Sequence, residues 1–264
     1  MMMKFAGKVA LITGGAQGLG RVFSEALLKR GAKVCMADID DKTGLKTLAQ
    51  FQQQYGQDSS TFVKCDVTSE NELKNAFSHT KQSLGGLDIL CNNAGIVNEI
   101  DWRKTIDINL IAVMTGTYLG LEAMRKDRGG NGGVIINVAS VAGIISISEG
   151  PSYTASKFGV VGFSKAMGED IDYPTHQVRV NCLCPTFADT PILHSSDRKV
   201  TKSSHYKLYK KRKELLGVMD PHRVGDAFIQ LVEDESQNGS VLTVTRDQIR
   251  YKKYPPPLTL TSKL

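Results

Sequence analysis

Long hydrophobic runs and metal-binding patterns are missing from this sequence. No apolar run approaches the roughly 18 residues that a membrane-spanning helix needs, and the apolar stretch Val9–Thr13 is too short for a signal peptide. The five histidines show no metal-ligand spacing, so we expect no metal site. The five cysteines form no Cys-x-x-Cys pair. We therefore expect reduced cysteines in the core of an intracellular protein.

The composition is that of an ordinary globular protein. The 264 residues are 41% hydrophobic and 23% charged, which suits one domain with a large core and argues against disorder. The net charge of +6 is partly local, because Lys207, Lys210, Lys211, Arg212 and Lys213 form a basic cluster. A solvated helix face is the favoured interpretation of this cluster, and we expect no nucleic-acid partner. The alternative is attraction of an anionic substrate.

Strand-like and helix-like segments alternate along the chain. The strand-like segments are short and near-continuously apolar, as expected for strands covered on both faces, and they are 8–13, 33–38, 61–66, 87–92, 134–139, 178–184 and 240–245. Helical periodicity marks 18–30, 41–54, 69–84, 102–125, 152–172 and 222–234. This alternation predicts an α/β fold: one domain over 1–264 with a doubly wound, Rossmann-type parallel sheet of about seven strands and helices on both faces. The irregular stretch 189–216 is the expected mobile substrate lid.

A glycine-rich loop joins the first strand to the first helix. In Thr13-Gly-Gly-Ala-Gln-Gly-Leu-Gly20, Gly14 permits a tight turn, and Gly18 and Gly20 let the backbone approach a pyrophosphate at a helix N-terminus. A glycine turn without a ligand is the plain alternative. The strand–turn–helix context favours a dinucleotide.

The residues after the second strand indicate which dinucleotide binds. Asp38 ends that strand, where a carboxylate can hold the adenine-ribose hydroxyls. A 2′-phosphate there would meet Asp38 with Asp40 and Asp41 nearby, and the glycine loop contains no Arg or Lys. We therefore expect NAD rather than NADP as the cofactor.

Tyr153 and Lys157 lie four residues apart, and Ser140 lies thirteen residues before Tyr153. On a helix this spacing puts the phenol and the ammonium on one face. A free tyrosine titrates near about 10, and a lysine charge within a few ångströms favours the phenolate. The three residues therefore predict a proton-transfer site for an alcohol or a carbonyl. Considered alone, Ser140 is as well explained as an ordinary serine at the end of a strand. A Tyr-Lys pair at this spacing also occurs often by chance.

Together with Asn92-Asn93-Ala94-Gly95 and Asn109, these motifs occur in the order and at the spacings of the short-chain dehydrogenase/reductases, which the chain resembles over nearly its whole length. The resemblance implies a catalytic set of Ser140, Tyr153, Lys157 and Asn109. It makes Tyr153 the acid/base, has Ser140 hold the substrate oxygen, and has Lys157 bind the nicotinamide ribose. Asn109 would maintain a water relay, although an asparagine in a helix is also often a local hydrogen-bonding residue.

The resemblance also implies which residues bind the cofactor and the substrate. The cofactor-binding residues would be Thr13, Gly14, Gln17, Gly18, Leu19, Gly20, Asp38, Ile39, Asp66, Val67, Asn93, Ala94, Gly95, Tyr153, Lys157, Thr186, Phe187 and Thr190. Asp66 is alternatively only a helix cap. Substrate contacts are expected from Ser140, Tyr153 and Phe187. Thr186 replaces the glycine that the family usually has after Pro185.

Within the family, Gly116-Thr-Tyr-Leu-Gly-Leu121 and Gly217-Val-Met-Asp-Pro221 resemble the prostaglandin-oxidising members. The expected reaction is therefore oxidation of a secondary alcohol by NAD, above all the 15-hydroxyl of prostaglandins and related hydroxylated fatty acids, to the ketone. Gly150 and Leu215-Leu216 depart from those members, which have a glutamine and a tyrosine pair there. A hydroxyacyl-thioester or steroid dehydrogenase, or a catalytically silent NAD- or RNA-binding protein, are the alternatives.

Two further expectations concern assembly and location. The family usually packs the helices that carry Asn109 and Tyr153 against a second subunit, which implies a homodimer or a tetramer. Ser262-Lys263-Leu264 matches the peroxisomal address read by a soluble receptor, and Pro255-Pro256-Pro257 should keep the tail 255–264 extended. We therefore expect a peroxisomal enzyme, with a cytoplasmic one as the alternative.

Overall fold

Eight strands form one sheet in the computed structural model, which describes residues 4–196 and 203–255. They are β1 (Val9–Thr13), β2 (Lys33–Asp38), β3 (Ser60–Lys64), β4 (Ile89–Asn92), β5 (Gly133–Val138), β6 (Val178–Pro185), β7 (Val241–Val244) and β8 (Ile249–Tyr251). Their order is β3-β2-β1-β4-β5-β6-β7-β8, and the first seven are parallel. The predicted doubly wound parallel sheet is confirmed. Its order reverses between β1 and β4, and a ligand crevice is expected at such a point.

The eighth strand, β8, was not predicted. It is only three residues long, pairs antiparallel with β7 and has no buried residue. A short edge strand of this kind lacks the apolar run that marked the other seven. The sheet therefore ends in one antiparallel strand.

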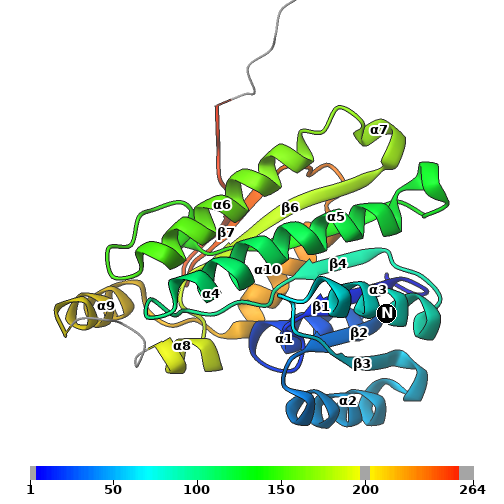
Figure 1. Ribbon diagram of the computed structural model, residues 1–264, viewed down its shortest axis with the longest axis horizontal. Helices are drawn as coiled ribbons and strands as arrows, with labels where there is room; N and C mark the ends of the chain where they lie inside the picture. The colour runs from blue at the N-terminus through cyan, green and yellow to red at the C-terminus, as the bar shows by residue number, and fades with distance from the viewer. Residues whose placement is uncertain (1–3, 197–202, 256–264) are drawn as a thin grey trace, which may run out of the picture.

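Helices cover both faces of the sheet (Figure 1). One face carries α1 (Gly18–Leu28), α2 (Asp41–Tyr55) and α10 (Pro221–Glu233), and the other carries α3 (Glu70–Leu84), α4 (Trp102–Ile106), α5 (Ala112–Met124) and α6 (Pro151–Gly168). The short α7 (Tyr173–His176) precedes β6, while α8 (Pro191–Ser196) and α9 (Ser203–Leu216) follow it. Figure 1 shows α8 and α9 together at one end of the molecule.

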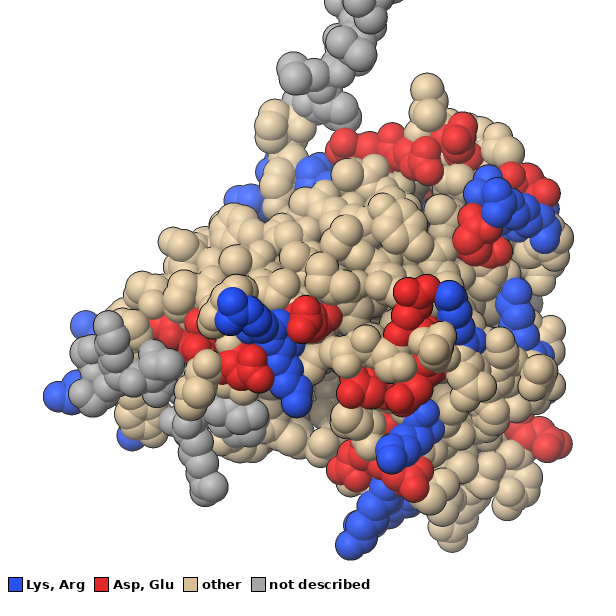
Figure 2. All heavy atoms as spheres, in the orientation of Figure 1, with Lys and Arg blue, Asp and Glu red and all other residues tan. Residues whose placement is uncertain are grey.

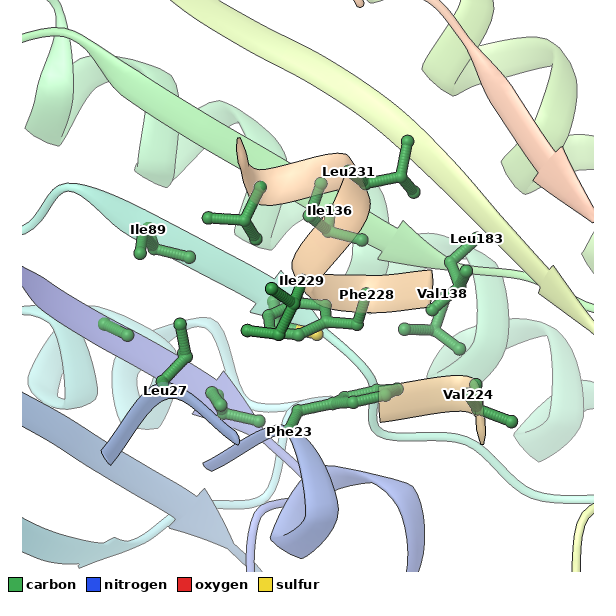
Figure 3. Packing of buried hydrophobic residues seen from close by; sticks show 14 of the residues in the cluster. Phe23, Leu27, Ile89, Ile136, Val138, Leu183, Val224, Phe228, Ile229 and Leu231 are labelled. Atoms are coloured by element: carbon green, nitrogen blue, oxygen red, sulfur yellow. The ribbon is translucent and has the colours of Figure 1, made fainter. Parts of the chain in front are cut away.

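The largest core cluster lies between the sheet and the α1–α10 face. Phe23 and Phe228 stack there with ring centroids 4.5 Å apart, and both are fully buried (Figure 3). Ile136 of β5 and Leu231 of α10 belong to the same cluster. Each such side chain contributes roughly 1.5–3 kcal/mol when it leaves water. All five cysteines are free and buried, as the sequence predicted.

Three predicted segments differ from the structure. The helix predicted over 102–125 contains a π-helical turn over Asp107–Ile111 between α4 and α5. The helix predicted over 152–172 ends at Gly168, after which α7 is separate. The stretch 189–216 is not irregular in its described part, since it contains α8 and α9. The sequence of α9 is basic and has no apolar stripe, so its pattern did not predict a helix.

Some expectations fall where the structure gives no description. Residues 197–202 of the proposed lid and all but the first residue of the tail 255–264, with Ser262-Lys263-Leu264, lie outside the described residues. In the parts of the chain that are described, no helix is long and apolar enough to cross a membrane.

Candidate active site

The loop between β1 and α1 needs glycine for two separate reasons. Gly14 and Gly18 have φ values of +63° and +57°, in the left-handed region that side chains rarely adopt. At Gly20 a Cβ atom would lie 2.0 Å from the carbonyl oxygen of Gly14, so only glycine lets the first turn of α1 pack on the loop. The loop thus forms a shallow cradle of backbone at the start of α1.

The N-terminus of α1 is open to an anion. Its N-cap residue, Gln17, makes no side-chain hydrogen bond to the helix, and the first turn carries no acidic residue. The first amides of a helix and its macrodipole attract negative charge. This cradle therefore fits the pyrophosphate of a dinucleotide.

Hydrogen bonds of Thr13 and Asn93 hold the glycine loop in place. The Thr13 hydroxyl accepts hydrogen bonds from the amides of Asn93 and Ala94, at 3.0 and 3.2 Å. The Asn93 side chain donates to the carbonyls of Thr13 and Gly14. These contacts connect the ends of β1 and β4, the two strands between which the strand order reverses. Thr13 therefore positions the loop and does not itself line the cavity.

Asp38 is held by the backbone at the end of β2. Its carboxylate accepts hydrogen bonds from the amides of Ala16 and Asp40, each at 3.0 Å. Asp38 lines the cavity beside Ile39, as do Asp66 and Val67 at the end of the neighbouring strand β3. Asp66 is not the cap of α3, because Ser69 takes that role; the Asp66 carboxylate instead accepts from Thr68.

One cavity of about 430 Å³ joins these groups to the proton-transfer residues. The predicted residues that line it are Gly14, Gln17, Gly18, Leu19, Asp38, Ile39, Asp66, Val67, Asn93, Ala94, Gly95, Ser140, Tyr153, Lys157, Thr186, Phe187 and Thr190. Thr13, Gly20 and Asn109 do not line it. The structure thus brings the predicted site together in one place.

Ser140, Tyr153 and Lys157 meet at the end of the cavity near β5 and α6. The Lys157 ammonium lies 5.7 Å from the centroid of the Tyr153 ring, which places both side chains on one face of α6. Lys157 also donates to the carbonyl oxygen of Val138 at 2.9 Å. The Ser140 hydroxyl bonds to Tyr153 and accepts from the amide of Ala142 at 3.2 Å.

Burial controls the protonation of this site. It raises the pKa of Tyr153 to about 12, and the hydrogen bond from Ser140 lowers it only in part. It also lowers the pKa of Lys157 to about 8, because the ammonium is almost fully removed from water. Burial is thus the largest influence on Tyr153 in the protein without its dinucleotide. That the Lys157 charge favours the phenolate during the reaction stays a prediction.

Asn109 lies in the π-helical turn between α4 and α5 and is fully buried. Its side chain accepts from the amide of Ile96 and donates to the carbonyl of Ile96, both at 2.8 Å. It also donates to the hydroxyl of Ser156 at 3.3 Å. The turn widens the helix and lets Asn109 reach both the β4 loop and α6. Asn109 therefore ties the wall of the cavity to the helix that carries Tyr153.

Glu99 is a site residue that the sequence analysis missed. The N-cap position of α6, Gly150, offers no side chain, and the Glu99 carboxylate takes its place. One Glu99 oxygen accepts from the amide of Tyr153 at 2.9 Å, and the other accepts from the amide of Ser152 at 3.1 Å. A cap from fifty residues away has no local sequence signature. Glu99 thus holds the backbone of Tyr153.

The far end of the cavity is built from β6, α8 and α9. Phe187 packs edge-to-face on Tyr209, with ring centroids 5.6 Å apart. Thr186 donates its amide to Val244, and the hydroxyl of Thr190 donates to Ala188. Tyr209 lines the cavity and was not predicted. Thr186 stands where the family usually has glycine, and its backbone amide still pairs with Val244 of β7.

The basic residues of α9 lie in two different environments, the solvent-exposed surface and the wall of the cavity. Lys207, Lys210 and Lys211 are exposed and do not line the cavity. Arg212 does line it, and its guanidinium makes a two-point ion pair with Glu149, at 2.7 and 3.3 Å. Burial would raise the pKa of Glu149, but the Arg212 partner and other hydrogen bonds hold it below its usual value.

A model of the family described as short chain dehydrogenase matches residues 8–201. The chain is also 39% identical over 256 residues to human 15-hydroxyprostaglandin dehydrogenase [NAD(+)], with 96% of each chain covered. The chain belongs to the short chain dehydrogenase family. This family membership makes the protein an NAD(P)-dependent oxidoreductase.

Three further proteins show the range of this similarity. The cattle 15-hydroxyprostaglandin dehydrogenase [NAD(+)] is 40% identical over 256 residues, with 96% of each chain covered. Zerumbone synthase of Zingiber zerumbet is 32% identical over 262 residues, covering 93% of this chain and 95% of that one. The crystal structure of levodione reductase superposes with a TM-score of 0.81 at 25% identity, covering 92% and 97% of the two chains.

Proposed function

We propose that this chain oxidises a secondary alcohol to a ketone with NAD, and that its substrates are hydroxylated fatty acids, including the 15-hydroxyl of prostaglandins. One observation carries the proposal: Ser140, Tyr153 and Lys157 line the same cavity as the glycine cradle and Asp38. The similarity to 15-hydroxyprostaglandin dehydrogenases over 96% of the chain supports the substrate class.

Each of the three residues has a distinct task in this reaction. Ser140 holds the oxygen of the alcohol by a hydrogen bond, and Tyr153 takes the hydroxyl proton. Lys157 binds the cofactor ribose and contributes positive charge beside the phenol. The dinucleotide, when bound, supplies a nicotinamide that accepts the hydride from the carbinol carbon and whose positive charge favours a phenolate. Asn109 supports the proton relay indirectly, by fixing the loop at Ile96 to Ser156 of α6.

Tyr153→Phe is the decisive variant. It removes the phenol oxygen and leaves the ring, so NADH formation from a racemic 15-hydroxy fatty acid should disappear while NAD binding stays within about threefold. Tyr254→Phe is the matched control, because Tyr254 is exposed beyond β8 and does not line the cavity. Wild-type turnover in Tyr153→Phe would disprove the assignment. A panel that adds a steroid alcohol, a hydroxyacyl thioester and borneol tests the substrate class.

NAD is preferred over NADP because of the carboxylate at the end of β2. Asp38 lines the cavity with its oxygens fixed by two backbone amides, so it presents fixed negative charge to the adenine ribose. A 2′-phosphate would lie against this charge. Hydroxyl groups would instead donate to it.

We further propose that two copies associate through α5 and α6, as a homodimer or within a tetramer. The face over these helices carries a broad band without charged side chains (Figure 2). Ile111 just before α5, Tyr118 of α5 and Phe158 of α6 are exposed. Phe158→Glu should therefore reduce the mass measured by sedimentation velocity by half or more. Ile171→Glu, which changes an exposed apolar residue after α6, should leave it unchanged. A monomeric wild-type chain would contradict the proposal.

A further inference from the structure

An ion pair forms part of the wall of the cavity beside the proton-transfer residues. Glu149 lies in the loop before α6, four residues ahead of Tyr153, and its side chain is only 3% exposed. Arg212 reaches it from α9, and its side chain is 22% exposed. The guanidinium uses Nε and one terminal nitrogen for the two carboxylate oxygens, a paired geometry that fixes both side chains.

The surroundings of this pair are apolar. Ile145 and Ile147 come just before Glu149 in the chain, and Leu216 lies one turn after Arg212 on α9. Phe187 and Leu193 contact Tyr209, which lies three residues before Arg212, and all of these residues line this end of the cavity. We call this end the substrate chamber; it comprises these five apolar residues with Tyr209, Glu149 and Arg212. Among the described residues that line the cavity, the cationic side chains are Arg212 and Lys157. Lys157 donates to the carbonyl of Val138 at the end of β5 and is not part of the chamber, so Glu149 and Arg212 set the charge of the chamber.

We propose that Glu149 is a specificity residue: by neutralising Arg212, it makes the substrate chamber selective for uncharged parts of the alcohol and unfavourable for a carboxylate close to the carbinol. This inference rests on the proposed function and narrows its substrate class. The preferred alcohols carry their hydroxyl far from any acidic group, on a hydrocarbon segment that fills the chamber.

The physical reason lies in the fixed geometry of the pair. A carboxylate that enters the chamber must displace Glu149 from Arg212 or lie beside the Glu149 charge in a poorly solvated space. At a separation of about 6 Å and an effective dielectric constant of about 20, one unit charge changes the affinity of a second by about 100-fold. An ester or a hydroxyl meets no such repulsion. The exposed Lys207, Lys210 and Lys211 do not line the chamber, so they do not offset it there.

The test compares 3-hydroxyoctanoate with its methyl ester at saturating NAD. The measured quantity is the ratio of kcat/KM for the acid to kcat/KM for the ester, which does not depend on how much of a variant is folded. The wild type should favour the ester by about tenfold or more. Glu149→Gln, which leaves Arg212 charged and unpaired, should raise the ratio by about tenfold or more. Arg212→Gln, which leaves Glu149 unpaired, should lower it by a similar factor.

Two further variants complete the test. The double variant with glutamine at both positions carries neither charge, so its ratio should lie between those of the single variants. Lys211→Gln changes an exposed neighbour on α9 and should leave the ratio unchanged. If Glu149→Gln does not fold, the comparison of Arg212→Gln with the double variant gives the same information.

A wild type that prefers the acid, or single variants whose ratio stays within about twofold of the wild type, would overturn this inference while leaving the oxidation of secondary alcohols intact. A wild type that oxidises neither compound nor a 15-hydroxy fatty acid would instead overturn the proposed function, and this inference with it.

Discussion

Replacing Glu99 tests whether a remote cap positions Tyr153. In Glu99→Ala, the amides of Ser152 and Tyr153 lose the carboxylate that accepts from both, at 3.1 and 2.9 Å. A helix cap contributes about 1 kcal/mol, and a hydrogen bond to a charged group contributes about 1.5–3 kcal/mol. Glu99 is partly exposed, so solvent replaces some of this. We expect a loss of about 2 kcal/mol in the free energy of unfolding.

This loss has a thermal and a kinetic consequence. For a chain of this size, about 2 kcal/mol lowers Tm by roughly 4–8 °C. The start of α6 also carries the Tyr153 backbone, and a shift of about 1 Å at the reacting group can lower the rate by about 100-fold. We therefore expect kcat to fall about tenfold or more, while NAD binding persists because the glycine loop does not contact Glu99.

Differential scanning calorimetry, steady-state kinetics and NAD titration together decide the matter. Glu99→Gln keeps one acceptor oxygen and should recover about half of the lost stability and activity. Glu70→Gln is the matched control, because Glu70 is an exposed carboxylate in the first turn of α3, where it pairs with Lys74 and caps no distant helix. A Glu99→Ala variant with the wild-type Tm and kcat, or one whose NAD affinity falls as much as its kcat, would show that Glu99 does not position Tyr153.

Three further outcomes follow from the site. Asp38→Asn removes the charge that faces the adenine ribose and should raise the NADP-to-NAD ratio of kcat/KM by about tenfold; a wild-type preference for NADP would contradict this. Gly20→Ala places a Cβ atom 2.0 Å from a backbone oxygen and should weaken NAD binding about tenfold or more, whereas Gly86→Ala has open space and should be neutral in the same titration. Burial lowers the pKa of Lys157 from its ordinary value of 10.5 to about 8 in the folded protein. Folding therefore disfavours its charged form below pH 8, and the stability of the wild type relative to Lys157→Met should rise by about 3 kcal/mol between pH 8 and 10.5 in urea titrations. A difference that does not change with pH would contradict the lowered pKa.

Local patterns were sufficient for most of the fold. Six of the seven parallel strands are buried on both faces, and only the edge strand β3 is partly buried, so most of the strands read as apolar runs in the sequence. Several turns between them carry glycine where φ is positive. Gly14 and Gly18 therefore marked the cofactor loop without any tertiary information. Tyr153 and Lys157 share a helix, so their spacing alone placed them side by side. Short or basic segments, such as β8 and α9, carry no such pattern and were missed.

The chain's sequence by itself determined the order of strands and helices, the glycine turn and the Tyr–Lys face, because each depends on residues close together in the chain. Only the tertiary structure decided which distant groups act on them. Glu99 reaches α6 from another loop, Arg212 meets Glu149 across 63 residues, and burial sets the pKa values of Tyr153 and Lys157. These contacts and the loss of water arise from packing, and packing brings together residues whose separation in sequence carries no signal.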